Sequence, residues 1–235
     1  MVLVNDFISC FFYLSFCDFV LACQRMTTPK EIKEIENRIG TLSNPGKMPC
    51  FAYSLPAKEC QQGKKLVKIK NSVCAGCYAL KGNYRFSNVA RAMQKRLESI
   101  KLESWVQDMV KLIKAKSLMP FFRWHDSGDL QSKEHLEKIC EIARLMPDFS
   151  FWLPTKEVKL VLDFGLDNIP KNLVVRISHF MVDKSWNGRF KGFLTSAVST
   201  VKDRVTCPAP MQGNKCLTCR ACWDTKTECV TYAKH

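Results

Sequence analysis

The chain has 235 residues, of which 46% are hydrophobic and 25% are charged. This composition describes a globular protein with a sizeable core, and the lack of internal repeats or low-complexity stretches argues against solenoids, coiled coils and long disordered tails. The formal net charge of +14 favours anionic partners such as nucleic acid, although charge alone identifies no reaction.

The first 25 residues form the least usual segment. Residues 7–23 are apolar and aromatic, yet Asp18 lies among them and no basic residue precedes them. A secretory signal begins with Lys or Arg, and a membrane span does not place a carboxylate in so short an apolar run. We therefore expect residues 1–25 to be an extension upstream of the true start at Met26. A membrane-associating helix is the alternative, and no stable membrane insertion is expected.

The distribution of the 13 cysteines separates a disulfide framework from a reduced protein that uses thiolates as ligands. Beyond the leader they gather in an early and a late group, with only Cys140 between the two groups. Two residues between cysteines allow both sulfurs to turn toward one metal. The sequence therefore predicts an intracellular metalloprotein. The predicted ligands are Cys50, Cys60, Cys74 and Cys77 in the early group, and Cys207, Cys216, Cys219 and Cys222 in the late group.

The early group predicts a metal site whose ligand count stays open. Cys74 and Cys77 form a compact CxxC pair around Gly76, while Cys60 and Cys50 lie upstream. Three sulfur ligands would leave one iron of a cluster open for a substrate or cofactor, whereas four would make a closed centre.

Basic residues lie between and after the early cysteines, with aromatic residues among them. Such a face can follow a phosphate backbone, although a solvated surface gives the same pattern. Nucleic acid is therefore one expected partner. The basic residues are Lys64, Lys65, Lys68, Lys70, Lys81, Arg85, Arg91, Lys95 and Arg96.

The middle of the chain alternates helices and strands, as in a parallel sheet wrapped by crossover helices. Residues 88–116 predict an amphipathic helix in two parts, Ser132 is expected to cap a helix over 133–145, and a further helical segment ends at Phe164. Strands are predicted over 121–124, 149–153, 173–177 and 193–198. We predict an α/β fold, an incomplete (β/α) barrel with parallel strands and cysteine-rich metal-binding loops near both ends.

Three regions are expected along the chain. Residues 1–25 are the extension, 26–205 the α/β domain with its N-terminal cysteine loop, and 206–235 a cysteine-rich metal-binding segment.

Polar residues follow each predicted strand. Because ligands bind beyond the carboxyl ends of parallel strands, these side chains are expected to line one cleft. For any single residue, a helix cap or a salt bridge is the alternative. The candidate catalytic residues are His125, Asp126, Asp129, Lys156 and Arg176, and the candidate cofactor-binding residues are Ser127, Gly128, Asp129, Thr155 and His179.

The segment from His125 to Asp129 is the sharpest of these clusters. Gly128 allows a backbone to approach a ligand closely, and Asp126 and Asp129 flank it. The segment suits an amine, a hydroxyl or a metal. His125 is expected to act as an acid or base, with a structural histidine beside Trp124 as the equal alternative.

The late group carries the most specific signal. Cys216, Cys219 and Cys222 have CxxCxxC spacing, which wraps readily around a cubane cluster, and Cys207 supplies a fourth sulfur. Zinc in a four-thiolate site is the alternative, although zinc usually uses two separated CxxC hairpins. We expect one or two iron–sulfur clusters of the [4Fe–4S] type, and Cys229 is an ordinary thiol.

Seven segments carry a family resemblance over about residues 44–223. They are NPGKMPC, SLPAKEC, VCAGCYALKGNY, FFRWHDSGDLQS, FWLPTKE, NLVVRIS and CPAP followed by GNKCLTCRACW. In this order they resemble the phage gene product 88 family. The resemblance implies a phage origin and the cytoplasm of an infected bacterial host, but no particular activity.

A more distant similarity concerns mechanism. An early cysteine loop, a Gly-acid motif after the next strand and a late cysteine cluster are similar to radical S-adenosylmethionine enzymes with an auxiliary cluster. This similarity implies that Cys60, Cys74 and Cys77 hold the cofactor-binding cluster and that residues 127–129 contact the cofactor's amine. It also implies that the late cysteines hold the auxiliary centre. Those enzymes mostly use CxxxCxxC, whereas thirteen residues separate Cys60 from Cys74.

Two hypotheses follow from the sequence. The first is an iron–sulfur enzyme of the radical type with an unknown substrate and a small-molecule cofactor. The second is a non-catalytic zinc- or cluster-stabilised module that binds nucleic acid or a host protein.

Overall fold

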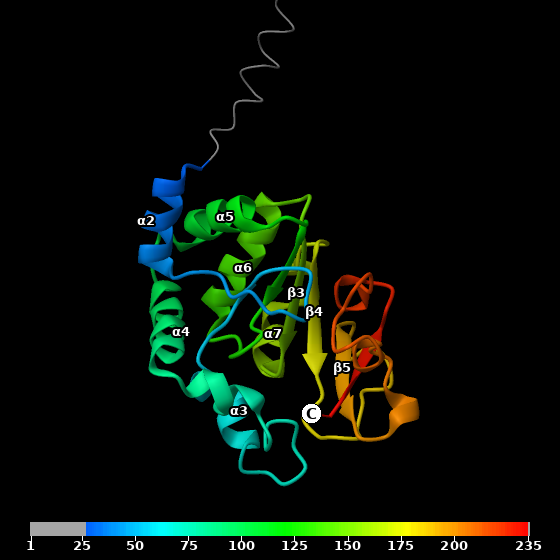
Figure 1. Cartoon of the computed structure of the whole chain (residues 1–235). Helices are drawn as coiled ribbons and strands as arrows, with labels where there is room; N and C mark the ends of the chain where they lie inside the picture. Colours follow the sequence, from blue (N-terminus) through cyan, green and yellow to red (C-terminus); the bar gives the residue numbers. More distant parts are fainter. Residues whose placement is uncertain (1–26, 235) are drawn as a thin grey trace, which may run out of the picture.

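Six parallel strands form the centre of the computed structural model, which describes residues 27–234 (Figure 1). Each strand pairs with the next one along the chain, so that the spatial order follows the sequence order. Within the described residues no pairing joins the last strand to the first, and closure into a barrel stays a prediction. The strands are β1 (Ala52–Tyr53), β2 (Phe121–Trp124), β3 (Ser150–Thr155), β4 (Leu173–Ser178), β5 (Leu194–Ser199) and β6 (Cys229–Ala233).

The α/β class and the parallel sheet are thereby confirmed. The predictions for residues 1–25 concern a segment outside the described residues. β6 lies within the predicted cysteine-rich segment and completes the same sheet as the rest of the chain. Between residues 27 and 234 no helix combines the length and the apolar character that crossing a membrane would require.

α-Helices connect β1 to β2, β2 to β3 and β3 to β4, as crossovers between parallel strands commonly do, whereas residues 179–193 join β4 to β5 without a helix. The two-part helix is confirmed by α4 and α5, and the Ser132 side chain caps α6 by accepting the His135 backbone N–H at 3.2 Å. Thr28 and Glu31 form a reciprocal capping box at the start of α2 (Pro29–Ile39). The α-helices are α2 (Pro29–Ile39), α3 (Gln61–Leu66), α4 (Ser87–Ser99), α5 (Trp105–Lys116), α6 (Lys133–Leu145) and α7 (Val158–Phe164).

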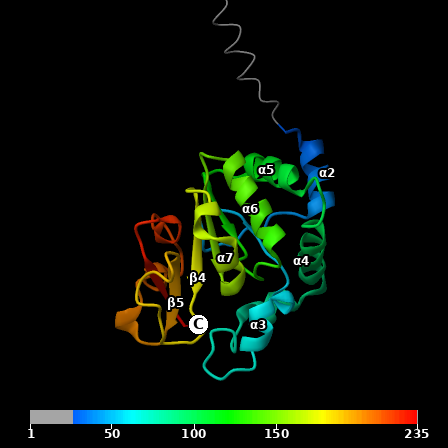
Figure 2. The ribbon, with the colours of Figure 1, turned by 180° about the vertical axis from the view of Figure 1, so that it is seen from behind.

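The main core lies between the sheet and the helices on one of its faces (Figures 1 and 2). Side chains alternate along each strand, so Phe122, Phe151 and Leu153 enter this core and are fully buried. Arg123 and Trp152, at the intervening positions, belong to the opposite face.

The late cysteine segment covers that opposite face. The short helix η7 (Ala221–Trp223) packs on β3 and β4. The Trp223 ring meets the Trp152 ring edge to face at 5.2 Å, and its Nε1–H donates to the Phe122 carbonyl at 2.9 Å. The sheet therefore has helices on one side and the late cysteine segment on the other.

Candidate metal centres

The four late cysteines surround one cavity of about 20 Å³ together with Trp223 and Val230. Such a volume accommodates about one water-sized sphere, so a single metal ion fits it as it stands, whereas a four-iron cluster requires the late loop to move outward. The Cys219 N–H donates to the Cys216 carbonyl at 2.8 Å, which closes a tight turn between these two ligand candidates. The Cys207 N–H donates to Thr231 of β6 at 3.0 Å, so the sheet positions the fourth thiol.

The thiols share the cavity without forming a coordination site. Between residues 27 and 234, no three Cys, His, Asp or Glu side chains stand in an arrangement that could hold a metal ion. The donor set nevertheless fits a thiolate-bound centre, because four sulfurs line an otherwise apolar cavity.

Cys50 belongs beside the late group, which corrects its place among the early ligands. It is buried with Trp152 and Trp223, against which Cys222 also packs. The reason is geometric: Cys50 precedes β1 and Cys60 follows it, so the two residues lie at opposite ends of that strand. The Cys216 N–H also donates to the Lys47 carbonyl at 2.9 Å, which joins the late loop to the segment before Cys50.

Guanidinium groups lie near Cys216 and Cys222 of the late group. Burial raises the pKa of Cys222 to about 11, while the Tyr232 hydroxyl, Arg176 and Arg123 act in the opposite direction. Burial likewise raises the pKa of Cys50 to about 12 against Arg123 and Arg220. A raised pKa keeps these thiols protonated when no metal is bound. When a metal ion displaces the protons, the nearby guanidinium groups stabilise the resulting thiolates.

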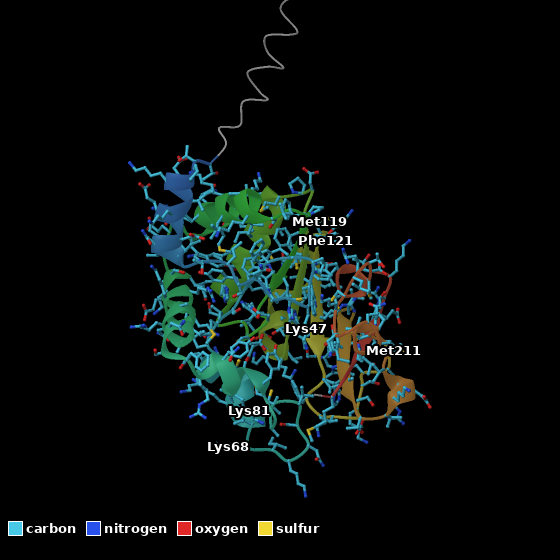
Figure 3. The ribbon with its side chains drawn as sticks, in the orientation of Figure 1. Lys47, Lys68, Lys81, Met119, Phe121 and Met211 are labelled. Atoms are coloured by element: carbon cyan, nitrogen blue, oxygen red, sulfur yellow. The ribbon has the colours of Figure 1, made fainter. Side chains whose placement is uncertain are left out.

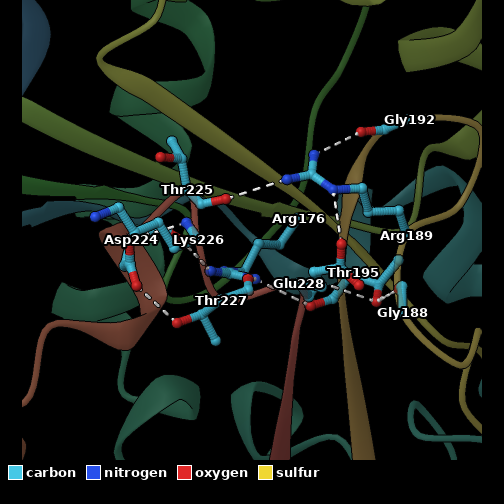
Figure 4. A network of polar contacts seen from close by, with 10 residues as sticks. All are labelled: Arg176, Gly188, Arg189, Gly192, Thr195, Asp224, Thr225, Lys226, Thr227 and Glu228. Carbon is cyan, nitrogen blue, oxygen red and sulfur yellow. Dashed lines mark hydrogen bonds and ion pairs between the residues drawn. The ribbon is translucent and has the colours of Figure 1, made fainter.

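Arg176 fastens the late segment to β4. It is fully buried, and Figure 4 shows its guanidinium among Thr195, Asp224 and Thr227. All five of its N–H groups donate to backbone carbonyls, so none is left for a substrate. Arg176 therefore has a structural role in place of the catalytic role predicted for it. The acceptors are Cys222 at 3.0 Å, Thr195 at 3.3 Å, Thr227 at 2.8 Å, Ala221 at 2.7 Å and Asp224 at 2.8 Å.

Three of the early cysteines lie near one another. The short helices η1 (Ala57–Glu59), directly before Cys60, and η2 (Tyr78–Leu80), directly after Cys77, contact each other. Burial raises the pKa of Cys60, and the charges of Asp129, Cys77 and Cys74 act in the same direction. Cys60 directly precedes α3, and the Cys77 N–H donates to the Cys74 carbonyl at 3.1 Å. The Cys74–Cys77 and Cys216–Cys219 pairs therefore form the same kind of turn.

Gly63 allows α3 to pack closely on Cys60. A Cβ atom at Gly63 would lie 2.7 Å from the Cys60 Cβ and 3.5 Å from its sulfur. The first distance is shorter than a normal van der Waals contact, so a side chain there would displace the thiol.

Asp129 joins the ends of β2 and β3 beside this trio. Its carboxylate accepts the Thr155 hydroxyl at 2.6 Å and the backbone N–H groups of Lys156 at 2.9 Å and Leu130 at 2.8 Å. Burial raises the pKa of Asp129, and these hydrogen bonds oppose the rise. The structure therefore brings three predicted site residues, Asp129, Thr155 and Lys156, to the carboxyl edge of the sheet.

The other predicted residues occupy separate places. His125 is buried on the helix side, 5.2 Å from the His135 ring, and neither of its ring nitrogens has a partner among the described residues. His179 packs on Trp186 at 4.7 Å and accepts the Met181 N–H at 3.1 Å. The predicted site residues therefore do not line one common cleft.

Ser127 and Gly128 contact the chain itself. The Ser127 hydroxyl donates to the Leu55 carbonyl at 2.9 Å. Gly128 has φ +84°, and a Cβ there would lie 2.8 Å from the Leu55 carbonyl oxygen. Gly128 therefore allows close approach of the Leu55 backbone, where the sequence predicted close approach of a ligand.

Sequence reasoning missed several polar groups at both sites. Arg123 stacks on the Trp152 ring at 4.5 Å, and Arg220 lies over Phe121 at 5.1 Å. Glu157 accepts the Gln62 N–H at 2.8 Å and so holds α3 to the end of β3. The sequence signal that could have revealed this site is Arg123 itself, because it is a charged residue within an apolar strand.

The sequence model described as gene product 88 matches residues 24–225. The chain belongs to the gene product 88 family. The match spans both cysteine groups and strands β1 to β5, and it confirms the family resemblance. No curated protein and no solved structure matches the chain.

Proposed function

We propose that this family member is an iron–sulfur protein with two cysteine-held centres. Cys60, Cys74 and Cys77 would hold one, and Cys207, Cys216, Cys219 and Cys222 the other. The observation that carries the proposal is the single cavity lined by the four late cysteines. The three arginines beside the late thiols support it, because a cluster held by four thiolates is anionic. When bound, such centres supply one-electron chemistry.

We extend the proposal to an enzyme of the radical S-adenosylmethionine type on an incomplete barrel. The sequential order of six parallel strands supports it, since (β/α) barrels share that order. The early trio lies beside Asp129 at the carboxyl ends of β2 and β3, where parallel folds bind ligands. With only three sulfurs at this centre, Asp129, Lys156 and Glu157 become the groups that would orient a cofactor.

Serine variants test the assignment of the two groups. Cys74→Ser with Cys77→Ser is expected to remove about half of the iron of anaerobically purified protein, and Cys216→Ser with Cys219→Ser the other half, because each pair serves one centre. Cys229→Ser, outside both groups, should keep the wild-type content. Iron and acid-labile sulfide are measured per chain.

A glycine pair sharpens the same experiment. Gly63→Ala should lower the early-centre iron by displacing Cys60, whereas Gly46→Ala, where a Cβ meets nothing within 4 Å, should not. Iron contents that are equal in all these variants and the wild type would refute the assignment.

A second candidate function, a metal-stabilised nucleic-acid-binding module, is favoured by the surface around the early loop. Lys65, Lys68 and Lys81 are exposed, and Tyr78 and Phe86 have exposed fractions of 50% and 58%. Figure 3 shows Lys68 and Lys81 at the same lower end of the molecule. Exposed rings among lysines suit stacked bases on a phosphate backbone.

Salt dependence tests this candidate. Replacing Lys65, Lys68, Lys70 and Lys81 by alanine should reduce the slope of log Kd against log salt for single-stranded nucleic acid by up to about 3. Fluorescence anisotropy measures the slope, and the exposed Lys111→Ala with Lys114→Ala on α5 is the control. Equal slopes in both variants would exclude this surface.

A further inference from the structure

A cavity of about 380 Å³ lies apart from both cysteine groups. It opens between residues 43–45, the carboxyl ends of β1 and β2, and α4, and no cysteine lines it. Its volume falls within the range of small-molecule sites. Its polar lining consists of Ser43, Asn44, Ser54, Tyr84, Asn88, Arg96 and Asp126.

The fold places two of these groups at the ligand-binding edge of the sheet. Ser54 directly follows β1, and Asp126 follows β2 after His125, whose φ of 53° ends the regular strand. α4 supplies Asn88, Ala92 and Arg96, which are four residues apart and share one helix face. Ligands bind beyond the carboxyl ends of parallel strands, so this is a favourable place for a site.

Asp126 is the central acceptor of this cavity. Its Oδ1 accepts the Ser54 hydroxyl, and its Oδ2 accepts the Tyr84 hydroxyl at 3.5 Å. A carboxylate has about four acceptor positions, so capacity for further donors remains. Among the described residues no Lys, Arg or His forms an ion pair with it.

Two arginines balance the charge of Asp126 from a distance. Burial lowers the pKa of Arg96, and the charges of Tyr53 and Asp126 oppose that shift. At Arg123, burial lowers the pKa, but the charges of Tyr78, Asp126, Tyr232 and Cys222 together raise it above its ordinary value. Arg96 also donates to Thr41 at 2.7 Å and Ser54 at 3.3 Å, which fixes it as scaffold. A cationic ligand is therefore not needed for charge balance.

We propose that this cavity binds a small neutral molecule with vicinal hydroxyl groups that donate to Asp126. A free sugar and the ribose of a nucleoside share this chemistry. Val89, Ala92 and Met93 give one wall of the cavity an apolar surface on which a nucleoside base can lie. The proposal does not depend on a metal in either cysteine group.

Calorimetric titration of the full chain with adenosine, ribose and 2′,3′-dideoxyadenosine tests the proposal. Adenosine should bind, and the dideoxy compound, which lacks both hydroxyls, should bind at least about tenfold more weakly. Ribose binding as tightly as adenosine identifies a sugar site, and adenosine binding alone identifies a nucleoside site. Equal affinity for adenosine and its dideoxy analogue, or no binding of adenosine and ribose, would overturn the proposal.

Variants locate the site. Asp126→Asn should cause the same tenfold loss for adenosine, and Val89→Trp should abolish binding by filling the cavity without touching the carboxylate. Asp148→Asn, an exposed carboxylate elsewhere, is the control. Because Asp126 also accepts internal hydrogen bonds, Val89→Trp keeps the test valid if Asp126→Asn fails to fold. Wild-type affinity in Val89→Trp would place the ligand elsewhere.

Discussion

Replacing Arg176 by methionine is expected to lower the free energy of unfolding by about 3 to 5 kcal/mol, since several buried carbonyls lose their donors at once. The late segment should then separate from β4, because four of the five accepting carbonyls lie between Ala221 and Thr227. Denaturant unfolding followed by tryptophan fluorescence measures the loss, with Trp223 as a reporter in the affected segment.

Arg189→Met is the matched control for this prediction. Arg189 lies in the same polar network, but its ion pair with Glu228, at 3.2 Å, is on the surface (Figure 4). Exposed pairs contribute about 0 to 1 kcal/mol, so this variant should unfold near the wild-type midpoint. Arg176→Lys keeps the charge without the planar fork and should recover only part of the stability. An Arg176→Met midpoint equal to that of the wild type would show that Arg176 does not fasten the late segment to β4.

The His125 and His135 pair is expected to make the fold unstable in acid. Burial lowers the pKa of His135 to about 3, and burial together with His135 lowers the pKa of His125 well below its ordinary value. The unfolded chain, with pKa values near 6.5, therefore binds more protons than the folded chain below that pH. Stability is fully present above about pH 6.5 and is lost as the pH falls from there toward the folded pKa values.

The slope of this loss is about 1.4 kcal/mol per pH unit for each histidine. His135→Phe, which preserves a ring beside Trp105, should remove one histidine's share, about 2 kcal/mol of pH dependence between pH 6.5 and 4.5. Denaturant unfolding at a series of pH values compares this variant with the wild type. The difference between the two chains isolates the histidine from other acid effects. Parallel curves for both chains would show that the pair does not control acid stability.

The sheet was predictable where strands and caps have local signals. The apolar run 121–124 and the Ser132 cap predict β2 and α6 with the observed bounds, since periodicity and capping act within one element. β1 has two residues, too few for a pattern, and the cysteine-rich composition around β6 hides its alternation. Helix α2 could have been found from Thr28, Pro29 and Glu31, which together form a capping signature.

The candidate sites were predictable in part, because spacing reports neighbours along the chain and not across the fold. The CxxC turns follow from spacing. The position of Cys50 does not follow from spacing, because it depends on the end of β1 at which the residue lies. Arg176 shows the same limit, because a charged residue in an apolar strand can bind either a ligand or backbone carbonyls. Only the packing of the late segment distinguishes these two roles.

The central claim is that two sets of cysteines each hold an iron–sulfur centre. Its most direct measurement is the iron and acid-labile sulfide content of wild-type protein made and purified without oxygen, with electron paramagnetic resonance after reduction. We predict about eight iron and eight sulfide per chain for two four-iron clusters, and signals from two centres. Protein that contains only zinc, or no metal at all, would contradict this account.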